Sequence, residues 1–378
     1  MRVCEQFSFK LGMAFAMFAV STAYGQQTVL IGAANPLTGS LAAMGKDAEN
    51  GARLAIEEIN EKGLIIQGQR VTLRLVGKDD AADPRTATTV AQILVDEQVV
   101  AVVGHLNSGA TIPASKVYSD AGITQVSGST NPAYTLQRFK TTFRIAATDA
   151  QQGPALANYL VKNYNVKKVA IVDDATSYGQ GLADEFERAI KASGVAVVSR
   201  DAISDRAVDF RAVLTKIKGE NPDAIMFGGT DAGAGPFAKQ AKQLSIASKI
   251  IGGDGICTEK ISELAGDAVD NVICSQAGAP IEKMSDGRGF QAKYMKRFGM
   301  PIQGYAPYDY DAVYAIADAM KRARAIDKAS ILAEMPKTNL DGVTGKISFD
   351  SKGDLSHATI SMYTYVSGKQ KFLVDFKQ

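Results

Sequence analysis

Residues 99–108 read VVAVVGHLNS, an unbroken apolar run that passes into a short polar loop. An apolar run without alternation is typical of a strand that is covered on both faces, as in a parallel sheet between layers of helices. On either side of this stretch, strand-like and helix-like segments alternate along most of the chain. The alternation predicts an α/β fold of parallel sheets with right-handed crossovers.

The predicted segments fall into two groups, because the rhythm of strand and helix restarts after Asp149. Strands are expected at 29–34, 70–77, 99–104, 168–172, 195–199, 224–227, 249–252, 345–349, 359–366 and 371–374. Helices are expected after Pro84 and at 46–62, 152–163, 181–192, 210–218, 235–244, 289–298 and 309–324. This grouping predicts two doubly wound parallel-sheet lobes.

The helix expected after Pro84 has clear signals at its start. Asp83 is a typical N-cap residue, and proline suits the first helical position. Val90, Ile93 and Leu94 are expected to form the buried face. The segment therefore predicts an amphipathic helix that packs on a sheet.

The length of the chain indicates its number of domains, and its charge indicates which partners are excluded. The chain has 378 residues, more than one ordinary hydrophobic core holds, so two domains are expected. Its formal net charge is only +2, and its lysines and arginines are scattered. Such a chain has no basic field to hold nucleic acid or an anionic membrane surface. We therefore expect no nucleic-acid partner.

The first 25 residues have the layout of a secretory signal peptide. Positive charge precedes an apolar run at residues 11–20, and the small residues Ala23 and Gly25 suit a cleavage site. A membrane anchor is the alternative, but about ten apolar residues are too few for the ~20 that a bilayer requires. We expect cleavage after Gly25 and an exported mature chain.

Two of the three cysteines, Cys257 and Cys274, remain in the mature chain. An even pair in an exported protein indicates a disulfide. Two separate buried thiols are the alternative. A bond between the pair would close a short loop and contribute about 3 kcal/mol at most.

The sequence lacks the common catalytic motifs. It has no G-x-S-x-G elbow and no Walker loop, and the glycine-rich residues 229–235 lack the G-x-G-x-x-G spacing. The two histidines, His105 and His357, lie far apart and have no metal-ligand spacing. We therefore expect no enzyme activity, no metal and no cofactor.

Five short polar motifs follow one another along the chain. They read GHLNS at 104–108, VSGST at 126–130, DAQQG at 149–153, SYGQG at 177–181 and GGDG at 252–255. In order and spacing they resemble the Leu/Ile/Val-binding family of periplasmic proteins, and the resemblance covers residues 26–378. The family implies a type I periplasmic binding fold, in which a ligand is clamped between two lobes joined by three crossover strands.

The resemblance also implies how the chain is divided and where it works. The N-terminal lobe would comprise residues 26–146 plus 277–349, and the C-terminal lobe residues 147–276 plus 350–378. The protein would be a periplasmic monomer, the substrate-binding component of an ABC importer that delivers an amino acid to membrane permease subunits. A sensory module for an amino acid or small amide is one alternative. An exported α/β hydrolase is another, although it would need the missing nucleophile elbow.

An amino-acid zwitterion requires donors for its carboxylate and acceptors for its ammonium group, because an unpaired buried charge is costly. By similarity to the family, the hydroxyls of Ser108 and Thr130 hold the carboxylate, together with backbone amides around Ser129. Asp254, with the Gly128 carbonyl and the Thr130 hydroxyl, would bind the ammonium group, where family members often carry Glu. On composition alone, Ser108 would be a helix N-cap and Asp254 a turn residue.

The remaining candidates surround the side chain of the ligand. Tyr178 is the lid residue that the family implies, with a surface loop tyrosine as the alternative. Met44 stands where some members place a tyrosine, and Thr230-Asp231 replaces another aromatic position. Tyr305 would close the apolar end or serve as a core aromatic. These departures leave open a different amino acid or a related small amide as the ligand.

Overall fold

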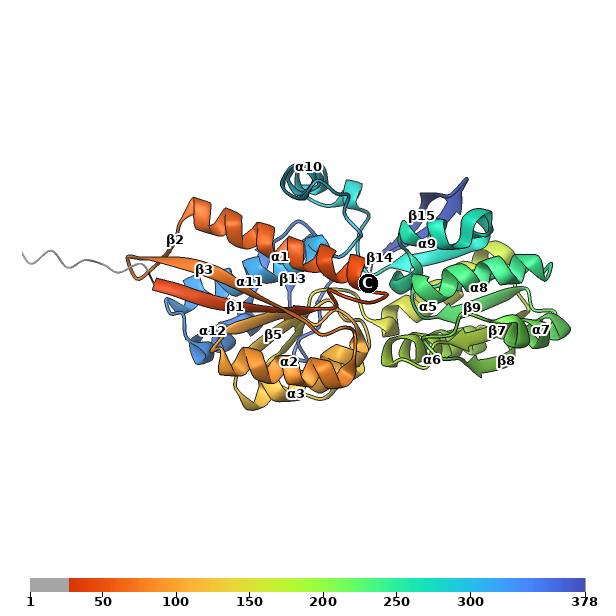
Figure 1. Cartoon of the computed structure of the whole chain (residues 1–378), viewed down its shortest axis with the longest axis horizontal. Helices are drawn as coiled ribbons and strands as arrows, with labels where there is room; N and C mark the ends of the chain where they lie inside the picture. The colour runs from red at the N-terminus through yellow and green to blue at the C-terminus, as the bar shows by residue number, and fades with distance from the viewer. Residues whose placement is uncertain (1–26, 378) are drawn as a thin grey trace, which may run out of the picture.

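The computed structural model describes residues 27–377, and the predicted signal peptide lies outside this range. The described chain forms two α/β halves that lie side by side along the long axis of the molecule (Figure 1). Each half is built around one mostly parallel sheet. The prediction of two doubly wound sheets is therefore confirmed.

The first sheet has six strands in the order β2-β3-β1-β4-β5-β6, and only β2 runs antiparallel to its neighbour. The strands are β1 (Gln27–Asn35), β2 (Leu64–Ile66), β3 (Gln69–Asp79), β4 (Ala101–Gly104), β5 (Thr124–Ser127) and β6 (Thr142–Arg144). The strand order reverses at β1, which pairs with β3 on one side and β4 on the other. In doubly wound sheets, such a switch point opens a crevice at the carboxyl ends of the strands.

Helices cover both faces of this sheet. They are α1 (Ala42–Lys62), α2 (Pro84–Asp96), α3 (Ser108–Asp120), α4 (Ala133–Leu136), α11 (Ala306–Ala323) and α12 (Lys328–Glu334). Successive side chains of a strand point to opposite faces. In β4, Ala101 and Val103 therefore pack with α1 and α11, whereas Val102 packs with α2 and α3. Cover on both faces explains why this strand is apolar throughout.

Helix α2 begins where the sequence predicts, but its buried face differs from the prediction at one residue. The Asp83 side chain accepts hydrogen bonds from the N–H groups of Arg85 and Thr86, at 3.0 and 2.8 Å. Val90 and Leu94 are buried, but Ile93 is 38% exposed. The prediction for Ile93 was wrong because the small residues of α2 complete a narrower buried stripe, and Ile93 lies beside it.

The second sheet has seven strands in the order β15-β14-β11-β10-β9-β7-β8. Its strands are β7 (Lys168–Asp173), β8 (Ala196–Ala202), β9 (Ala224–Gly228), β10 (Lys249–Gly252), β11 (Val272–Gln276), β14 (Thr359–Val366) and β15 (Lys369–Lys377). Its helices are α5 (Asp149–Tyr164), α6 (Ser177–Ala192), α7 (Arg211–Glu220), α8 (Asp231–Gln243), η1 (Asp254–Ile256), α9 (Lys260–Ala265) and η2 (Gly266–Asn271). β7 to β11 are parallel and β14–β15 is an antiparallel edge hairpin. A second switch point lies at β7, between β8 and β9.

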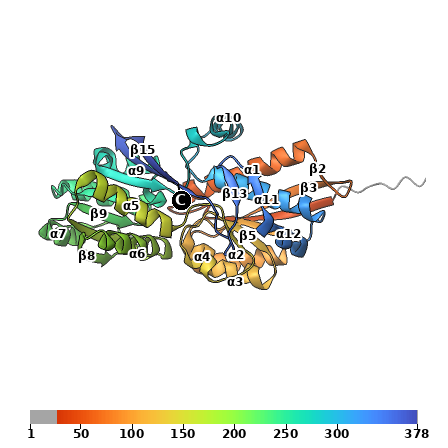
Figure 2. The ribbon, with the colours of Figure 1, turned by 180° about the vertical axis from the view of Figure 1, so that it is seen from behind.

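The chain passes between the two halves three times, after β6, after β11 and before β14. The other elements are η3 (Ile281–Lys283), α10 (Gly287–Phe298), η4 (Met335–Lys337), β12 (Asn339–Asp341) and β13 (Lys346–Ser348). Figures 1 and 2 place α11 and α12 with the first sheet and β15 with the second. The turn at Gly353 stays with the first sheet, because its carbonyl accepts from the Arg144 N–H at 2.7 Å. The lobe limits that the family implies stay a prediction.

Candidate ligand-binding site

A cavity lies between the two halves, bounded by loops that follow strands of both sheets. Its space amounts to about 350 Å³ when the open mouth is counted. The first half contributes Leu41, Met44, Leu106, Asn107, Ser108, Gly128, Ser129, Thr130 and Tyr305, and the second contributes Tyr178, Thr230, Asp254 and Gly255. These residues include every predicted ligand residue except Asp231.

One side of the cavity carries hydroxyl groups at the start of a helix. Ser108 is the first residue of α3 and is 1% exposed. Its Oγ accepts hydrogen bonds from the Ser129 hydroxyl at 3.2 Å and the Asn131 N–H at 3.3 Å, which leaves its own O–H to donate. The Thr130 hydroxyl is buried and has no hydrogen-bond partner among residues 27–377. With the N–H groups at the start of α3, these hydroxyls suit an anion.

Arg144, at the end of β6, holds the loop that carries these hydroxyls. Its guanidinium donates to the carbonyl of Ser129 and, at 3.0 Å, to the carbonyl of Asn131. The Asp354 carboxylate pairs with Arg144 Nε at 2.8 Å. Arg144 is fully buried, so this pairing compensates a charge that would otherwise be costly. The planar guanidinium of arginine can donate to several acceptors that lie in different directions, whereas the single ammonium group of lysine could not reach them all.

The opposite side of the cavity carries Asp254. Its Oδ1 accepts hydrogen bonds from Gln152 Nε2 at 2.8 Å and from the Tyr178 hydroxyl at 3.1 Å. The Ser275 hydroxyl donates to Oε1 of Gln152 at 2.7 Å and so orients its amide. Burial raises the pKa of Asp254, and the two hydrogen bonds from Gln152 and Tyr178 offset part of that rise. Asp254 is thus a buried acceptor held in one orientation.

A second carboxylate lies near the first, at a position that the sequence did not single out. Asp149 is fully buried, and neither of its oxygens has a hydrogen-bond partner within the described chain. Its N–H donates to the Thr130 carbonyl at 2.8 Å, which places it directly behind the hydroxyl side of the cavity. Burial, reinforced by the charge of Asp254, raises the pKa of Asp149 well above its ordinary value, and the proximity of the Thr130 hydroxyl offsets part of that rise. Asp149 is the first residue of the DAQQG motif, but the motif alone does not indicate a binding role, because an acidic residue in the first turn of a helix also stabilises the helix.

The third part of the wall is apolar. Leu41, Met44 and Leu106 belong to one small buried cluster, and Tyr305 packs against it. The Tyr305 hydroxyl reaches the carbonyl of Asp254 at 3.5 Å, so this ring spans from one half to the other. Met44, at the position where a tyrosine was the family alternative, leaves a flexible aliphatic wall.

Asp231 does not reach the cavity. It is the first residue of α8, and its Oδ2 accepts a hydrogen bond from the Thr258 hydroxyl at 2.7 Å. The preceding residue, Thr230, lines the cavity instead. Of the predicted pair Thr230-Asp231, only Thr230 therefore lies in the cavity wall.

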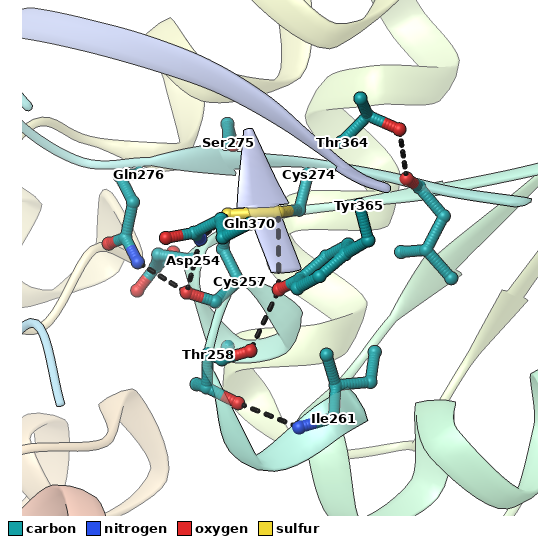
Figure 3. The surroundings of a disulfide bond; sticks show 12 residues. Asp254, Cys257, Thr258, Ile261, Cys274, Ser275, Gln276, Thr364, Tyr365 and Gln370 are labelled. Atoms are coloured by element: carbon teal, nitrogen blue, oxygen red, sulfur yellow. Dashed lines mark hydrogen bonds between the residues drawn. A yellow bond between two sulfur atoms is a disulfide. The ribbon is translucent and has the colours of Figure 1, made fainter. Parts of the chain in front are cut away.

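A disulfide joins Cys257 to Cys274, as predicted, and excludes two separate thiols. Figure 3 shows Asp254 beside Cys257 on the loop that the bond attaches to β11. The Cys257 N–H donates to the Asp254 carbonyl at 3.0 Å, and the Gln276 amide donates to the Cys257 carbonyl at 2.5 Å. The disulfide thus anchors the segment that presents the Asp254 carboxylate.

The sequence pattern that defines the family described as "Periplasmic binding protein" matches residues 28–370. The chain belongs to the periplasmic binding protein family. Its members bind solutes without turning them over, so this binding protein is not an enzyme. The resemblance seen in the five motifs is confirmed over nearly the whole chain.

Relatives and solved structures support the same placement. This binding protein is 35% identical to an amino acid binding protein of Pseudomonas aeruginosa, covering 92% of this chain and 94% of the relative. It is 34% identical to Leu/Ile/Val-binding protein homolog 1 of Brucella abortus, covering 90% and 91%. The substrate-binding protein LivJ of Streptococcus pneumoniae, solved with isoleucine, superimposes with a TM-score of 0.84 at 31% identity, covering 92% and 99%. A solute-binding protein of R. palustris, solved with benzoate, shares the fold at 19% identity and a TM-score of 0.82, covering 92% and 95%.

Residues 27–377 contain neither a candidate membrane span nor a candidate metal site. No helix in this range combines the length and apolar character needed to cross a bilayer. The same range contains no cluster of His, Cys, Asp or Glu residues arranged to hold a metal ion.

Proposed function

We propose that this binding protein captures an aliphatic α-amino acid, of the branched-chain type, for an ABC importer. The observation that carries the proposal is the distribution of groups around one cavity. Hydroxyls and a helix N-terminus lie on one side, the Asp254 carboxylate with Asp149 nearby lies on another, and aliphatic side chains form the third. A zwitterion with an apolar side chain matches all three.

In this proposal the ligand carboxylate accepts hydrogen bonds from Ser108 and Thr130 and from the N-terminus of α3. The ligand ammonium donates to Asp254 and to the Gly128 carbonyl, with Asp149 as the second negative group. The Thr130 hydroxyl and the Asp149 oxygens lie close enough for Thr130 to lower the pKa of Asp149, but no hydrogen bond of regular geometry joins them to each other or to another group of residues 27–377. This incomplete pairing supports the arrangement, since buried polar groups without partners are rare in folded proteins.

The apolar wall supports the choice of ligand. Leu41, Met44 and Leu106 present hydrocarbon to the cavity, with Tyr305 beside them. The Streptococcus pneumoniae structure with isoleucine supports a branched aliphatic side chain. Benzoate, the ligand of the R. palustris protein, carries no cation that could neutralise Asp254 and Asp149. We therefore favour an amino acid over an aromatic carboxylate.

We further propose that ligand binding closes a hinge formed by the three crossover segments. The lobes would be residues 26–146 plus 277–349 and residues 147–276 plus 350–378, with the second crossover near residue 277. The protein would act as a monomer in the periplasm, after removal of residues 1–25, and present its closed form to the permease subunits. Closure around a ligand is a common device of two-lobed binding proteins.

Thermal unfolding with a ligand panel tests the proposal. The panel contains the twenty amino acids, small aliphatic amides and benzoate. We expect leucine, isoleucine and valine to raise the melting temperature most, because a ligand at a hundred times its Kd adds about 2.7 kcal/mol of stability. A shift with benzoate or the amides alone, and none with any amino acid, would contradict the proposal.

A further inference from the structure

A hydrogen bond joins the two halves next to the cavity, between the residue that follows Thr130 and the residue that precedes Tyr178. Asn131, in the loop after β5, donates a hydrogen bond from Nδ2 to the Ser177 carbonyl in the first turn of α6, at 2.5 Å. Its Oδ1 accepts from the Ala133 N–H at 2.8 Å, and its carbonyl accepts from Arg144. The Asn131 side chain is therefore held by its own half while it reaches the other.

The contact depends on a missing side chain. Gly181 lies one helical turn after Ser177, where its N–H shares the same carbonyl in a regular helix. A Cβ atom added at Gly181 would lie 2.3 Å from Nδ2 and 3.0 Å from Cγ of Asn131, and 3.7 Å from its Oδ1. These three atoms of Asn131 are the three nearest neighbours of that Cβ. The space above Gly181 is thus occupied by a residue of the opposite half.

We propose that Asn131 and Gly181 form a closure latch, in which glycine at position 181 admits the Asn131 amide and so permits the lobes to close on a ligand. This inference rests on the proposed ligand binding between the lobes. An alanine at 181 would force the amide off the Ser177 carbonyl or hold the lobes apart. In an open form the clash is absent, so the penalty falls on closure alone.

The expected effect on binding follows from a population argument. If only the closed form completes the site, the apparent Kd equals the intrinsic Kd divided by the closed fraction. A substitution that destabilises closure weakens binding without touching any ligand contact. Gly181 has no positive φ and lies within α6. Alanine there is compatible with the helix and has the higher helix propensity.

Calorimetric titration of L-leucine, L-isoleucine and L-valine tests the latch in four variants of the full mature chain. We expect Gly181→Ala to weaken binding about tenfold or more, while the melting temperature of the unliganded protein stays the same or rises. In the Asn131→Ala background the substitution should have almost no further effect, because the amide that it clashes with is gone. Such non-additivity is the signature of direct coupling between two residues.

Gly219→Ala is the matched control. Gly219 lies in α7, has no positive φ, and an added Cβ would meet nothing within 4 Å. We expect wild-type affinity for this variant. Wild-type affinity in Gly181→Ala would overturn the latch, and so would an equal loss in the Asn131→Ala background or a lowered melting temperature of the unliganded Gly181→Ala protein. A wild-type protein that binds none of the three amino acids would overturn the proposed function as well.

Discussion

The Tyr178 hydroxyl donates a hydrogen bond to Oδ1 of Asp254 and accepts one from the N–H of Gly255, at 3.1 and 2.8 Å. The phenol therefore binds the side chain of one residue and the backbone of the next. Burial and the nearby charge of Asp254 raise the pKa of Tyr178 well above its ordinary value, so the hydroxyl keeps its proton to donate. This pair of bonds gives the candidate ammonium acceptor a defined orientation.

Asp254→Asn should weaken amino-acid binding by about tenfold or more, or about 1.4 kcal/mol. The amide preserves the shape of the side chain but removes the negative charge that an ammonium group needs. Isothermal titration with L-leucine measures the change. Asp231→Asn is the comparison, because Asp231 bonds to Thr258 away from the cavity, and we expect it to change affinity by less than about twofold. A larger loss in Asp231→Asn than in Asp254→Asn would mean that the ammonium site is elsewhere.

Ligand affinity should rise with pH above the ordinary Asp range. Burial raises the pKa of both Asp149 and Asp254 above 3.8, so in the ligand-free protein these two carboxyls retain protons at pH values where free carboxyls have lost them. An ammonium group pairs with ionised carboxylates, so binding releases a proton and higher pH favours it. Titrations at about pH 5 and about pH 8, in buffers of different ionisation enthalpy, report both the affinity and the proton release. A pH-independent Kd with no proton release would contradict this prediction.

The free energy of unfolding of the unliganded protein should change with pH in the opposite direction, falling as pH rises. Because the folded-state pKa of Asp149 is raised, its contribution is fully present below the unfolded value of 3.8 and is lost as pH rises through the folded value. Asp149→Asn removes the ionisable group. We expect this variant to lose less stability between acid and neutral pH than the wild type, as measured by urea unfolding across that range. Parallel curves for the two proteins would contradict the assignment.

Removal of the disulfide should lower the free energy of unfolding by about 3 kcal/mol, the value expected for a closed loop of this length. The bond joins residues 17 positions apart. Urea unfolding of the Cys257→Ala/Cys274→Ala variant measures the loss, and wild type with added reductant is the matched comparison. We also expect weaker leucine binding, because the loop that the bond anchors presents Asp254. Full affinity in the variant would show that the hydrogen bonds of Gln152 and Tyr178 suffice to hold Asp254.

Arg144→Lys should weaken ligand binding even though it conserves the positive charge. Lysine keeps the positive charge near Asp354 but cannot reach the carbonyls of Ser129 and Asn131 together. The loop that carries Thr130 then loses its support, and we expect a loss of about tenfold or more in affinity. Titration with leucine, together with the melting temperature, separates this effect from unfolding. A large drop in stability with affinity unchanged in the folded fraction would assign Arg144 to the fold alone.

The sequence by itself determined the alternation of strands and helices, the start of α2 at Asp83 and Pro84, and the loops that bound the cavity. These features are local, because they depend on side-chain periodicity, on the φ angle of proline and on the capping of a helix. Three of the five polar motifs, at 104–108, 126–130 and 252–255, begin at strand ends, and the other two form the first turns of α5 and α6. The cysteine pair left a choice between a bond and two thiols, which only the proximity of Cys257 and Cys274 in the fold resolved.

Only the tertiary structure decided which of two acidic residues at helix starts lies close to Asp254. Asp231 and Asp149 both begin a helix after a polar loop, and their sequence contexts do not distinguish them. Thr258, from another segment, binds Asp231 away from the cavity, whereas the Thr130 carbonyl holds the backbone of Asp149 beside Asp254. The direction of a side chain at a helix start is set by such partners, which lie far away in sequence and come close only when the sheets assemble.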